Sequence, residues 1–499
     1  MNDFIKTMNN TTETENGALT NKSTFNGCLD WFFHGAALRH QDENRIIDLF
    51  SKAFEEDPQT ALRTLFYIRD CRGGQGEREI FRKCLVWLAN NQTVWLIGNL
   101  DLISIYGRYD DYLCLLDTEI NQVVATYLIS IMLKDIHHVE FNESFSLCAK
   151  WMPSLTSSKT VRKQAKTLIN LANKSGSFQN PINEATYRKM VSKLRKAIKI
   201  VEHNLTNRDY DSIDYSKVPS YASLKYRSAF KRNDYEHYNK YLEDVKSGKV
   251  KINTGTLYPY DLVSKYPVHC GLWDQKIPLD QTVEEQWKAL PDYVPEINGL
   301  VVYDTSGSMS GLPMDVSMSL ALYISERNKS EIWRNYCIPF SSKAEWKEVK
   351  GDTLLDKLHS IYTGDCSNTN LQSVFDLILG RAVAFKVKPE DMPKVLLIIT
   401  DMEFDYVDNI FGRTSTFSTT NFKVIEEKYK EAGYERPNLV WWNVQSRNTQ
   451  TPVTKDDNGN ILISGCSPSV LKVALSGEFD PIEAMNRVVN QERYEQIKF

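Results

Sequence analysis

Residues 300–310 read LVVYDTSGSMS, and this stretch decides how the C-terminal part of the chain folds. Four apolar or aromatic residues, Leu300 to Tyr303, are followed at once by Asp304 and a run of small polar residues. A short, continuously apolar run of this kind is typical of a buried parallel strand. We therefore expect a strand, then a loop rich in side-chain oxygen atoms, then a helix.

The alternation of strands and helices continues to the end of the chain. Strand-like and helix-like segments take turns at 314–327, 333–340, 371–385, 395–400, 422–431, 439–442, 461–464, 469–474 and 481–489. Apolar strands that alternate with amphipathic helices indicate a parallel sheet covered on both faces. We predict a doubly wound α/β domain over residues 299–499. A proline-rich, extended crossover over residues 253–298 precedes it.

Five residues at the strand ends have side chains that suit a metal ion. Asp304, Ser306 and Ser308 form a D-x-S-x-S loop, Thr369 lies in the loop before a helix, and Asp401 directly follows the strand at 395–400. Ligands of open α/β sheets bind at the carboxyl ends of the strands, and carboxylate and hydroxyl oxygens suit a hard divalent cation. Taken alone, the D-x-S-x-S loop is also explained as a helix cap.

The order and spacing of these residues resemble the von Willebrand factor A family over about 200 residues. The resemblance implies that Asp304, Ser306, Ser308, Thr369 and Asp401 form a metal-ion-dependent adhesion site that holds Mg²⁺ or Mn²⁺, directly or through water. It also implies that a protein partner offers an acidic residue to the metal, because a cation with few protein charges attracts an external anion.

The N-terminal half shows helical periodicity instead. Apolar residues recur at spacings of three and four over residues 29–252, with short glycine-containing breaks between the helices. We predict an α-helical, HEAT-like solenoid domain there. Residues 1–28 are expected to form a flexible segment that carries little stability.

The charge is unevenly distributed. The chain of 499 residues has a net charge of -4, yet residues 159–251 contain about 21 Lys and Arg against about 9 Asp and Glu. A basic face of this kind suits RNA phosphates, and a solvated helix face explains it equally well. The candidate RNA-binding residues are Arg188, Lys189, Lys193, Arg195, Lys196, Lys199, Lys225, Arg227, Lys231 and Arg232. Aromatic residues among them can stack bases, although we expect most of them to pack in the core: Tyr187, Tyr210, Tyr215, Tyr221, Tyr226 and Phe230.

Several N-terminal motifs resemble an uncharacterised family of plants, microbes and large DNA viruses. They lie at residues 15–18, 28–33, 69–78, 106–111, 149–154 and 251–259. In that family a helical domain precedes an A domain, an arrangement similar to the Ro (TROVE-type) ribonucleoprotein. The resemblance implies binding of small or structured RNA. The chain is accordingly expected to be a cytoplasmic RNA-binding protein, and a viral origin is compatible with it.

The motif at residues 69–78 reads RDCRGGQGER and has two interpretations. Its charged residues suit a salt-bridged corner between two helices, with the glycines in the turn. Its GGQG stretch formally matches the phosphate-binding GXXG loop of KH domains, although no β pattern surrounds it. We favour the structural interpretation.

No enzyme signature is found. The sequence contains no H-E-x-x-H, P-loop or G-x-S-x-G motif, so we expect a non-enzymatic binding protein with no catalytic residues. Its nine cysteines lack C-x-x-C spacing, and its apolar runs are too short for a membrane helix. The alternative function is a protein scaffold or adaptor without RNA binding, linked to an ATPase machine.

Overall fold

A computed structural model describes residues 10–15, 17–266, 277–296, 298–340, 344–363, 371–404, 407–409, 412–414 and 419–499. The chain divides into two compact units, each described by itself. The first, the sheet unit, comprises residues 1–68, 73–75 and 254–498. The second, the helical unit, comprises residues 69–72, 76–253 and 499. This division differs from the predicted boundaries, because residues 29–68 belong to the sheet unit.

The sheet unit is built around a six-stranded mixed sheet. Its strands lie in the spatial order β10 (Asn460–Ser464), β9 (Asn438–Asn443), β6 (Val395–Thr400), β3 (Gly299–Asp304), β4 (Tyr336–Phe340) and β5 (Lys347–Glu348). The first five are parallel, and β5 pairs antiparallel with β4. Every residue of β3 and β6 is buried, as expected for apolar strands covered on both faces.

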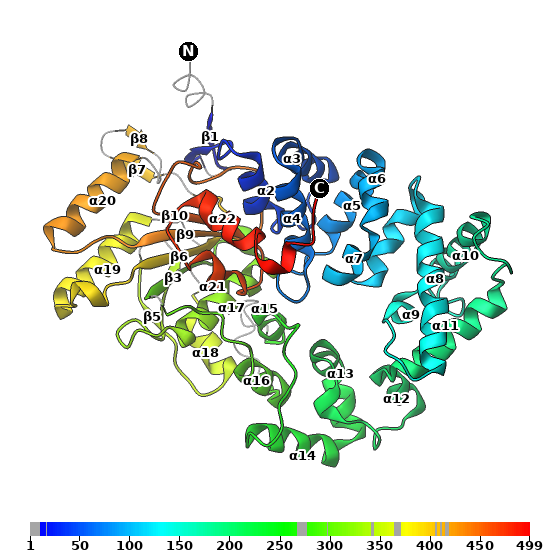
Figure 1. The fold of residues 1–499 in the computed structure, drawn as a ribbon. Coiled ribbons are helices and arrows are strands. Elements are labelled where there is room, and N and C mark those ends of the chain that lie inside the picture. Colours follow the sequence, from blue (N-terminus) through cyan, green and yellow to red (C-terminus); the bar gives the residue numbers. More distant parts are fainter. Residues whose placement is uncertain are drawn as a thin grey trace. The chain divides into compact units, whose positions relative to one another are not determined.

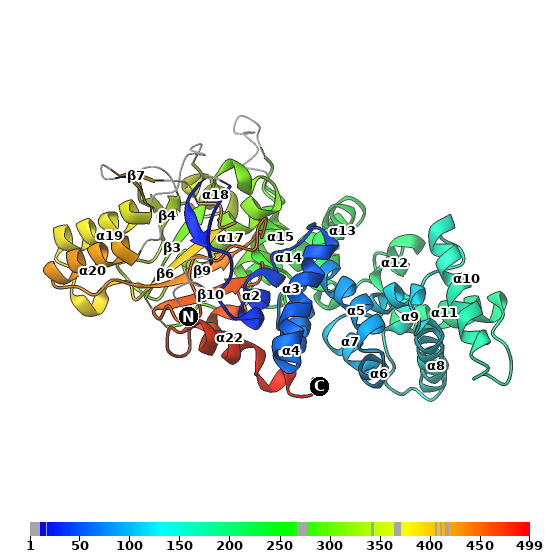
Figure 2. The same cartoon turned by 90° about the horizontal axis from the view of Figure 1, so that it is seen from above.

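Helices cover both faces of this sheet. Helix α17 (Leu312–Arg327) packs on β3, β4 and β6, whereas α22 (Pro481–Val489) packs on β10. Figure 2 shows the strands lying between these two helices. The remaining elements of this part are α15 (Pro259–Val263), α16 (Gln281–Lys288), η4 (Gly307–Met309), α18 (Leu354–Ile361), α19 (Leu371–Phe385), η5 (Pro389–Asp391), β7 (Val407–Asn409), β8 (Gly412–Thr414), α20 (Thr419–Glu431), α21 (Val470–Ala474) and η6 (Glu492–Tyr494).

The N-terminal helices complete the sheet unit. They are α2 (Gly27–Gly35), α3 (Glu43–Glu56) and α4 (Pro58–Arg69). Helix α2 packs against α3 and β10, and Ser464 of β10 donates a hydrogen bond from Oγ to the Phe32 carbonyl at 2.8 Å. Eight consecutive residues of α2 are buried. A helix that is apolar on all sides requires cover on all sides, which explains why it joins the sheet rather than the helical unit.

Two further predictions differ from the structure. Residues 11–21, expected to be flexible, contain an antiparallel pair of strands, β1 (Thr11–Glu13) and β2 (Leu19–Asn21), held by backbone hydrogen bonds that need no apolar side chains. The crossover expected to be extended contains the helices α15 and α16. Helix α15 begins with Pro259 in its first turn, a position where proline starts a helix rather than breaking it.

The helical unit contains helices and irregular segments, with no strand at residues 76–253. Helix α8 (Asn121–Glu140) packs against η1, α9, α10 and α11. The elements follow in order in Figure 1: α5 (Glu79–Asn91), α6 (Thr93–Gly98), α7 (Leu100–Tyr106), η1 (Tyr109–Asp117), α8, α9 (Cys148–Trp151), α10 (Lys159–Lys174), α11 (Glu184–Ile198), α12 (Val201–Asn207), η2 (Tyr215–Lys217), α13 (Ser220–Asn233) and α14 (Tyr235–Lys246).

The last helices of this unit enclose an aromatic core. Tyr215, Phe230 and Tyr238 lie at its centre, and the ring centroids of Tyr215 and Tyr238 are 4.7 Å apart. Across the parts of the chain that the structure describes, no helix combines the length and the apolar character needed to span a bilayer. The cysteines described there are free thiols.

Candidate metal site and basic helices

The candidate metal residues lie at the carboxyl-terminal edge of the sheet. Asp304 is the last residue of β3, and Asp401 directly follows β6. The two strands are parallel neighbours, with Tyr303 beside Ile399. From β3 the chain proceeds to β4 on one side, and from β6 it proceeds to β9 on the other. This is the switch point at which open α/β sheets bind ligands.

Side-chain oxygens gather at this switch point. Thr400 donates a hydrogen bond from Oγ1 to Asp304 Oδ2 at 2.6 Å, and the backbone N–H of Ser306 donates to Asp304 Oδ1 at 2.8 Å. The hydroxyl oxygens of Ser306 and Ser308 are 2.9 Å apart. The loop after β3 therefore turns its oxygens toward the end of β6. Thr369, the fifth predicted ligand, lies outside the described residues.

Both aspartates are buried, and one oxygen of Asp401 has no hydrogen-bond partner among the described residues. Asp304 is 3% exposed and Asp401 is 1% exposed. Burial raises the pKa of both carboxyls, and the charge of Asp304 raises the pKa of Asp401 further. Asp401 Oδ2 is buried and has no hydrogen-bond partner among the described residues. A buried carboxylate oxygen without a partner is costly unless a cation occupies the site.

The donor set fits a hard divalent cation. Two carboxylates and two hydroxyls are the oxygen ligands that Mg²⁺ and Mn²⁺ accept, with water in the remaining positions. No three His, Cys, Asp or Glu side chains converge on one point within the described ranges. A cation at this edge would consequently depend on hydroxyl and water ligands beside Asp304 and Asp401.

Arg447 is a site residue that the sequence analysis did not identify. It lies in the loop after β9, where its Nε is 3.7 Å from Asp401 Oδ2 and its Nη2 donates to the Ser308 carbonyl. Helix α3 supports this loop, because Arg45 donates to the Arg447 carbonyl. Arg447 provides a positive charge at the edge that holds both aspartates. It lies five residues after the end of the predicted strand 439–442, and this place in a loop at the carboxyl end of a strand was the available signal.

The turn between β1 and β2 contacts the same edge. The Thr14 hydroxyl donates to the Phe404 carbonyl at 2.6 Å, and the backbone N–H of Glu15 donates to Glu403 Oε2 at 2.9 Å. The other oxygen of Glu403 accepts from Asn448 Nδ2 at 2.8 Å. Glu403 thus joins the N-terminal segment to the loops after β6 and β9. Sequence analysis predicted no role for it.

The ten candidate RNA-binding residues lie on or beside two helices of the helical unit. Arg188, Lys189, Lys193, Arg195 and Lys196 are on α11, with Lys199 as its C-cap, and Lys225, Arg227, Lys231 and Arg232 are on α13. Eight of these side chains are exposed, whereas Arg195 and Arg227 are half-buried. The two helices therefore present cations to solvent, as the periodicity predicted.

Two of these side chains serve the fold of the helical unit. Arg195 donates from Nε to the Ala149 carbonyl at 2.9 Å and from Nη2 to the Met152 carbonyl at 2.7 Å, which satisfies carbonyls at the end of α9. Arg227 donates to the Leu224 carbonyl at 2.7 Å. These two arginines are better assigned to packing than to RNA.

The aromatic residues of the basic segment behave mainly as core residues. Tyr187, Tyr215 and Phe230 are buried, while Tyr210 and Tyr226 are half-buried. Tyr221 is 55% exposed, so it alone of these six presents most of its ring surface to solvent.

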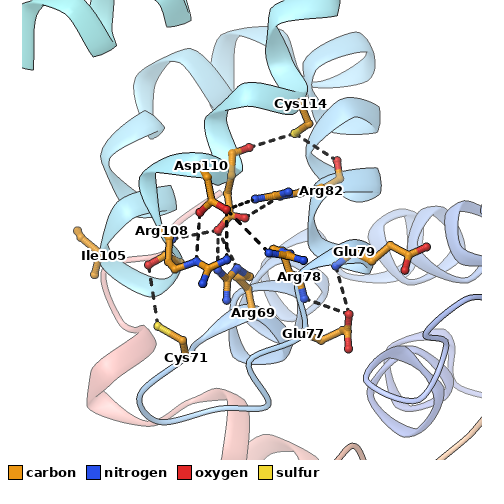
Figure 3. A network of polar contacts seen from close by, with 12 residues as sticks. Arg69, Cys71, Glu77, Arg78, Glu79, Arg82, Ile105, Arg108, Asp110 and Cys114 are labelled. Atoms are coloured by element: carbon orange, nitrogen blue, oxygen red, sulfur yellow. Dashed lines mark hydrogen bonds and ion pairs between the residues drawn. The ribbon is translucent and has the colours of Figure 1, made fainter. Parts of the chain in front are cut away.

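The charged motifs of the N-terminal half form a buried ion-pair network within the helical unit (Figure 3). Arg69 is 2% exposed, and its Nη2 lies 2.7 Å from Asp111 Oδ2. Arg82 Nε lies 2.8 Å from Asp111 Oδ1, and Arg82 Nη2 lies 2.8 Å from Asp110 Oδ2. Both oxygens of Asp111 are paired. Arg108 pairs with Asp110 at 3.1 Å, so the motifs at 69–78 and 106–111 meet in one network.

Within the sheet unit, Gln75 of the GGQG stretch has a structural role. It is 2% exposed, its Nε2 donates to the Tyr67 hydroxyl at 2.6 Å, and its Oε1 accepts from the Ser467 N–H at 2.9 Å. A phosphate-binding loop would present its backbone to solvent. The buried Gln75 favours the structural interpretation of this motif.

Family models match the chain in two parts. A model described as a domain of unknown function, DUF2828, matches residues 14–116 and 118–298. The chain belongs to the DUF2828 family. A second domain of unknown function, DUF7788, matches residues 298–498. In this DUF2828 protein the two family models meet at residue 298, directly before strand β3.

Two known proteins are similar to this DUF2828 protein. An uncharacterised protein of Acanthamoeba polyphaga mimivirus is 31% identical over 97% of this chain and 88% of its own length. The crystal structure of the Ro (RSR) protein of Deinococcus radiodurans aligns with 94% of this chain and 93% of its own, with 12% identity and a TM-score of 0.35.

Proposed function

We propose that the sheet unit contains a von Willebrand factor A-type domain with a functional metal site. Asp304, Ser306, Ser308, Thr369 and Asp401 would hold Mg²⁺ or Mn²⁺. The observation that carries this proposal is the pair of buried aspartates at the switch point, of which Asp401 keeps an unpartnered carboxylate oxygen. A divalent cation would satisfy that oxygen and offset the charge of both residues.

The proposed role of the metal is to bind a partner, not to catalyse a reaction. A divalent cation would offset the charges of Asp304 and Asp401, and Arg447 offsets that of Glu403 at the same edge. An open coordination position on such a cation attracts an acidic side chain of a protein partner, and Arg447 can donate hydrogen bonds to the same carboxylate. Among the described residues around Asp304, we assign Ser306, Ser308 and Asp401 as further metal ligands. Thr400 orients the Asp304 carboxylate through its hydrogen bond.

Calorimetric titration of the full chain with MgCl₂ or MnCl₂ tests the metal proposal. Asp304→Ala should abolish binding while circular dichroism shows that the fold is retained. Ser310→Ala provides a matched control from the same loop, because Ser310 is exposed and lies outside the proposed ligand set. Unchanged binding in Asp304→Ala, or equal loss in the control, would reject the site.

For the helical unit we propose a HEAT-like platform that binds small or structured RNA through the exposed cations of α11 and α13. Its helices pack on partners that lie within a few elements along the chain, chiefly α8 with α10 and α11, and also α5 with η1 and α13 with α14, a local pattern that repeat arrays share. The exposed lysines and arginines supply charges of the kind that phosphate binding requires.

An RNA shift assay at two salt concentrations tests this second proposal. Charge reversal at Arg188, Lys189 and Lys196 should weaken RNA binding and reduce its salt dependence, while metal affinity is unchanged. A wild-type chain that binds no RNA at about 50 mM salt would favour the alternative, an adaptor that contacts only proteins.

A further inference from the structure

The amino-terminal edge of the sheet, away from the two candidate metal aspartates, carries a cluster of aromatic rings around one arginine. The arginine is Arg381 on α19, and its Cζ lies 4.1 Å from the ring centroid of Tyr336 and 4.8 Å from that of Trp346. The rings of Trp333 and Phe385 both lie at 5.8 Å. Tyr336 is the first residue of β4, and α19 ends at Phe385 ahead of β6. Parallel strands begin at the same edge of a sheet, which places the cluster there.

The guanidinium of Arg381 is held in place but not neutralised. Among the described residues, Arg381 has no hydrogen-bond or ion-pair partner, and none of its nitrogens is buried. The acidic residues next to the cluster on β5 and just before it pair with lysines instead, Glu345 with Lys347 at 2.7 Å and Glu348 with Lys350 at 2.9 Å. Stacking on aromatic rings orients a planar guanidinium without using its N–H groups. Arg381 therefore presents an oriented set of donors to solvent.

The segment after α19 increases the positive charge around the cluster. Residues 381–394 contain four cations and two acids: Arg381, Lys386, Lys388, Lys394, Glu390 and Asp391. The backbone carbonyl of Asp391 accepts a hydrogen bond from Trp333 Nε1 at 2.7 Å, so η5 lies beside the cluster. Neither acid of η5 forms an ion pair with Arg381 in the described part of the chain. The three lysines are exposed, and the excess of cations over acids remains uncompensated.

The same surface also exposes apolar area. Phe385 is 75% exposed, and Tyr336 and Trp346 are half-exposed. A single exposed aromatic ring is common on protein surfaces, but here three rings surround an unpaired arginine. Arginine and aromatic side chains are also the residues that contribute most to protein interfaces. A complementary ligand would supply both an anion and an apolar group.

We propose that the Arg381 surface, formed by Arg381, Phe385, Tyr336 and Trp346, docks an acidic segment of a partner protein in which a carboxylate lies next to an apolar side chain. The carboxylate would accept two parallel hydrogen bonds from the Arg381 guanidinium, whose fork matches its geometry. The apolar side chain would cover the exposed ring of Phe385. This docking needs no metal ion, so it is independent of the candidate metal site and of RNA binding by the helical unit.

Fluorescence anisotropy with the full chain in EDTA tests this proposal with three labelled probes. They are a peptide of alternating Glu and Leu, its Gln counterpart, and a uridine oligonucleotide of equal length. The Glu peptide should bind, and the Gln peptide should bind at least about tenfold more weakly, because it lacks carboxylates. EDTA removes divalent cations, so binding under these conditions does not arise from the metal site. Equal binding of the Glu and Gln peptides, or none by the Glu peptide, would overturn the proposal.

Variants locate the peptide on the molecule. Arg381→Gln should weaken binding of the Glu peptide about tenfold, whereas Lys472→Gln should leave it unchanged. Lys472 is an exposed cation on α21 of the same unit, so the control removes an equal charge. Equal loss in both variants would contradict the proposal. Loss of oligonucleotide binding in Arg381→Gln, with unchanged peptide binding, would assign the surface to nucleic acid instead.

Phe385→Ala tests the surface separately from folding, since Arg381 also stacks within the protein. Because Phe385 is mostly exposed, its removal should leave the thermal midpoint nearly unchanged. The affinity for the Glu peptide should fall about threefold, because the Leu side chains lose their apolar contact. Phe141→Ala is the matched control, since Phe141 is 64% exposed and follows α8 in the helical unit. Unchanged affinity in Phe385→Ala, or an equal loss in Phe141→Ala, would contradict the assignment.

Discussion

Two buried aspartates of this molecule, Asp111 and Asp401, are in opposite electrostatic situations. Asp111 in the helical unit is completely buried, yet each of its carboxylate oxygens pairs with an arginine, Arg69 or Arg82. Asp401 in the sheet unit is 1% exposed, and its Oδ2 has no hydrogen-bond partner among the described residues, with the Nε of Arg447 3.7 Å away. Burial alone therefore does not separate a structural carboxylate from a functional one. Their hydrogen-bond partners do.

The difference has a physical basis. An ion pair that satisfies both oxygens offsets the cost of removing the carboxylate from water. Its loss leaves the buried Arg69 without that counter-ion, whereas Arg82 keeps its ion pair with Asp110. A carboxylate with an unpartnered oxygen contributes a cost to the empty protein that an external cation can remove. Removal of the carboxylate charge should therefore lower the free energy of unfolding at Asp111 and leave it unchanged or raise it at Asp401.

The largest expected effect is at the paired aspartate. Asp111→Ala should lower the free energy of unfolding by about 3–5 kcal/mol, because Arg69 and Arg82 lose their buried counter-ion. Urea denaturation of the full chain measures it. Glu79→Ala removes a half-exposed ion pair with Lys83 and should cost less than about 1 kcal/mol. A similar, small cost for both variants would show that the network is not structural.

A pH effect is expected at His34, which lies beside the loop that carries Arg447. Its Nδ1 is 2.7 Å from Ser446 Oγ, and burial lowers its pKa from 6.5 to about 3. The folded state then binds fewer protons than the unfolded state, so the stabilising contribution of His34 is lost as the pH falls below 6.5. The stability difference between wild type and His34→Asn should narrow by about 2 kcal/mol from pH 7 to pH 5.

Urea denaturation of both chains at pH 7, 6 and 5 measures this difference. Both proteins contain the same other titratable groups, so the pH dependence that those groups cause cancels in the difference between the two free energies of unfolding. A difference that stays constant over this pH range would show that His34 is accessible to protons in the folded protein.

A smaller effect is expected at the unpartnered aspartate. Without metal, Asp401→Asn should leave the protein as stable or raise its free energy of unfolding by about 1 kcal/mol, because a buried charge with too few partners is removed. Urea denaturation in the presence of EDTA measures it. A loss of more than about 2 kcal/mol would place Asp401 in the same class as Asp111.

The smallest effect is expected at Arg447, which competes with a cation for Asp401. Arg447→Ala should tighten Mn²⁺ binding about threefold, the amount expected for a half-exposed ion pair. Arg334→Ala is the control, because Arg334 is exposed and precedes β4 at the opposite edge of the sheet. Weaker Mn²⁺ binding in Arg447→Ala would show that Arg447 supports the metal site rather than competing with it.

Much of the sheet was predictable from sequence, because its central strands are continuously apolar. The predicted strand at 395–400 matches β6, and the strand beginning at Leu300 matches β3 within one residue at each end. The helix at 371–385 is also found as predicted. Those positions fix the carboxyl edge, and with it the location of Asp304 and Asp401.

The surroundings of the site were not predictable in the same way. The apolar helix α2 indicates burial, but periodicity does not tell which surface covers it. The sequence therefore grouped residues 29–68 with the helices that follow, whereas by their contacts they belong to the sheet unit. Arg447 and Glu403 lie in loops, where side-chain type carries no periodic signal. Their roles follow from the position of the loops in space and from single hydrogen bonds.

The central claim is that the unpartnered oxygen of Asp401 marks a metal site, whereas the paired oxygens of Asp111 do not. Thermal unfolding with and without 5 mM MnCl₂ tests it most directly, since a ligand of the folded state raises the midpoint. The wild-type chain and the milder variant Asp111→Asn should both gain stability with Mn²⁺, and Asp401→Asn should gain none. Equal gains in all three proteins, or none in the wild type, would contradict the claim.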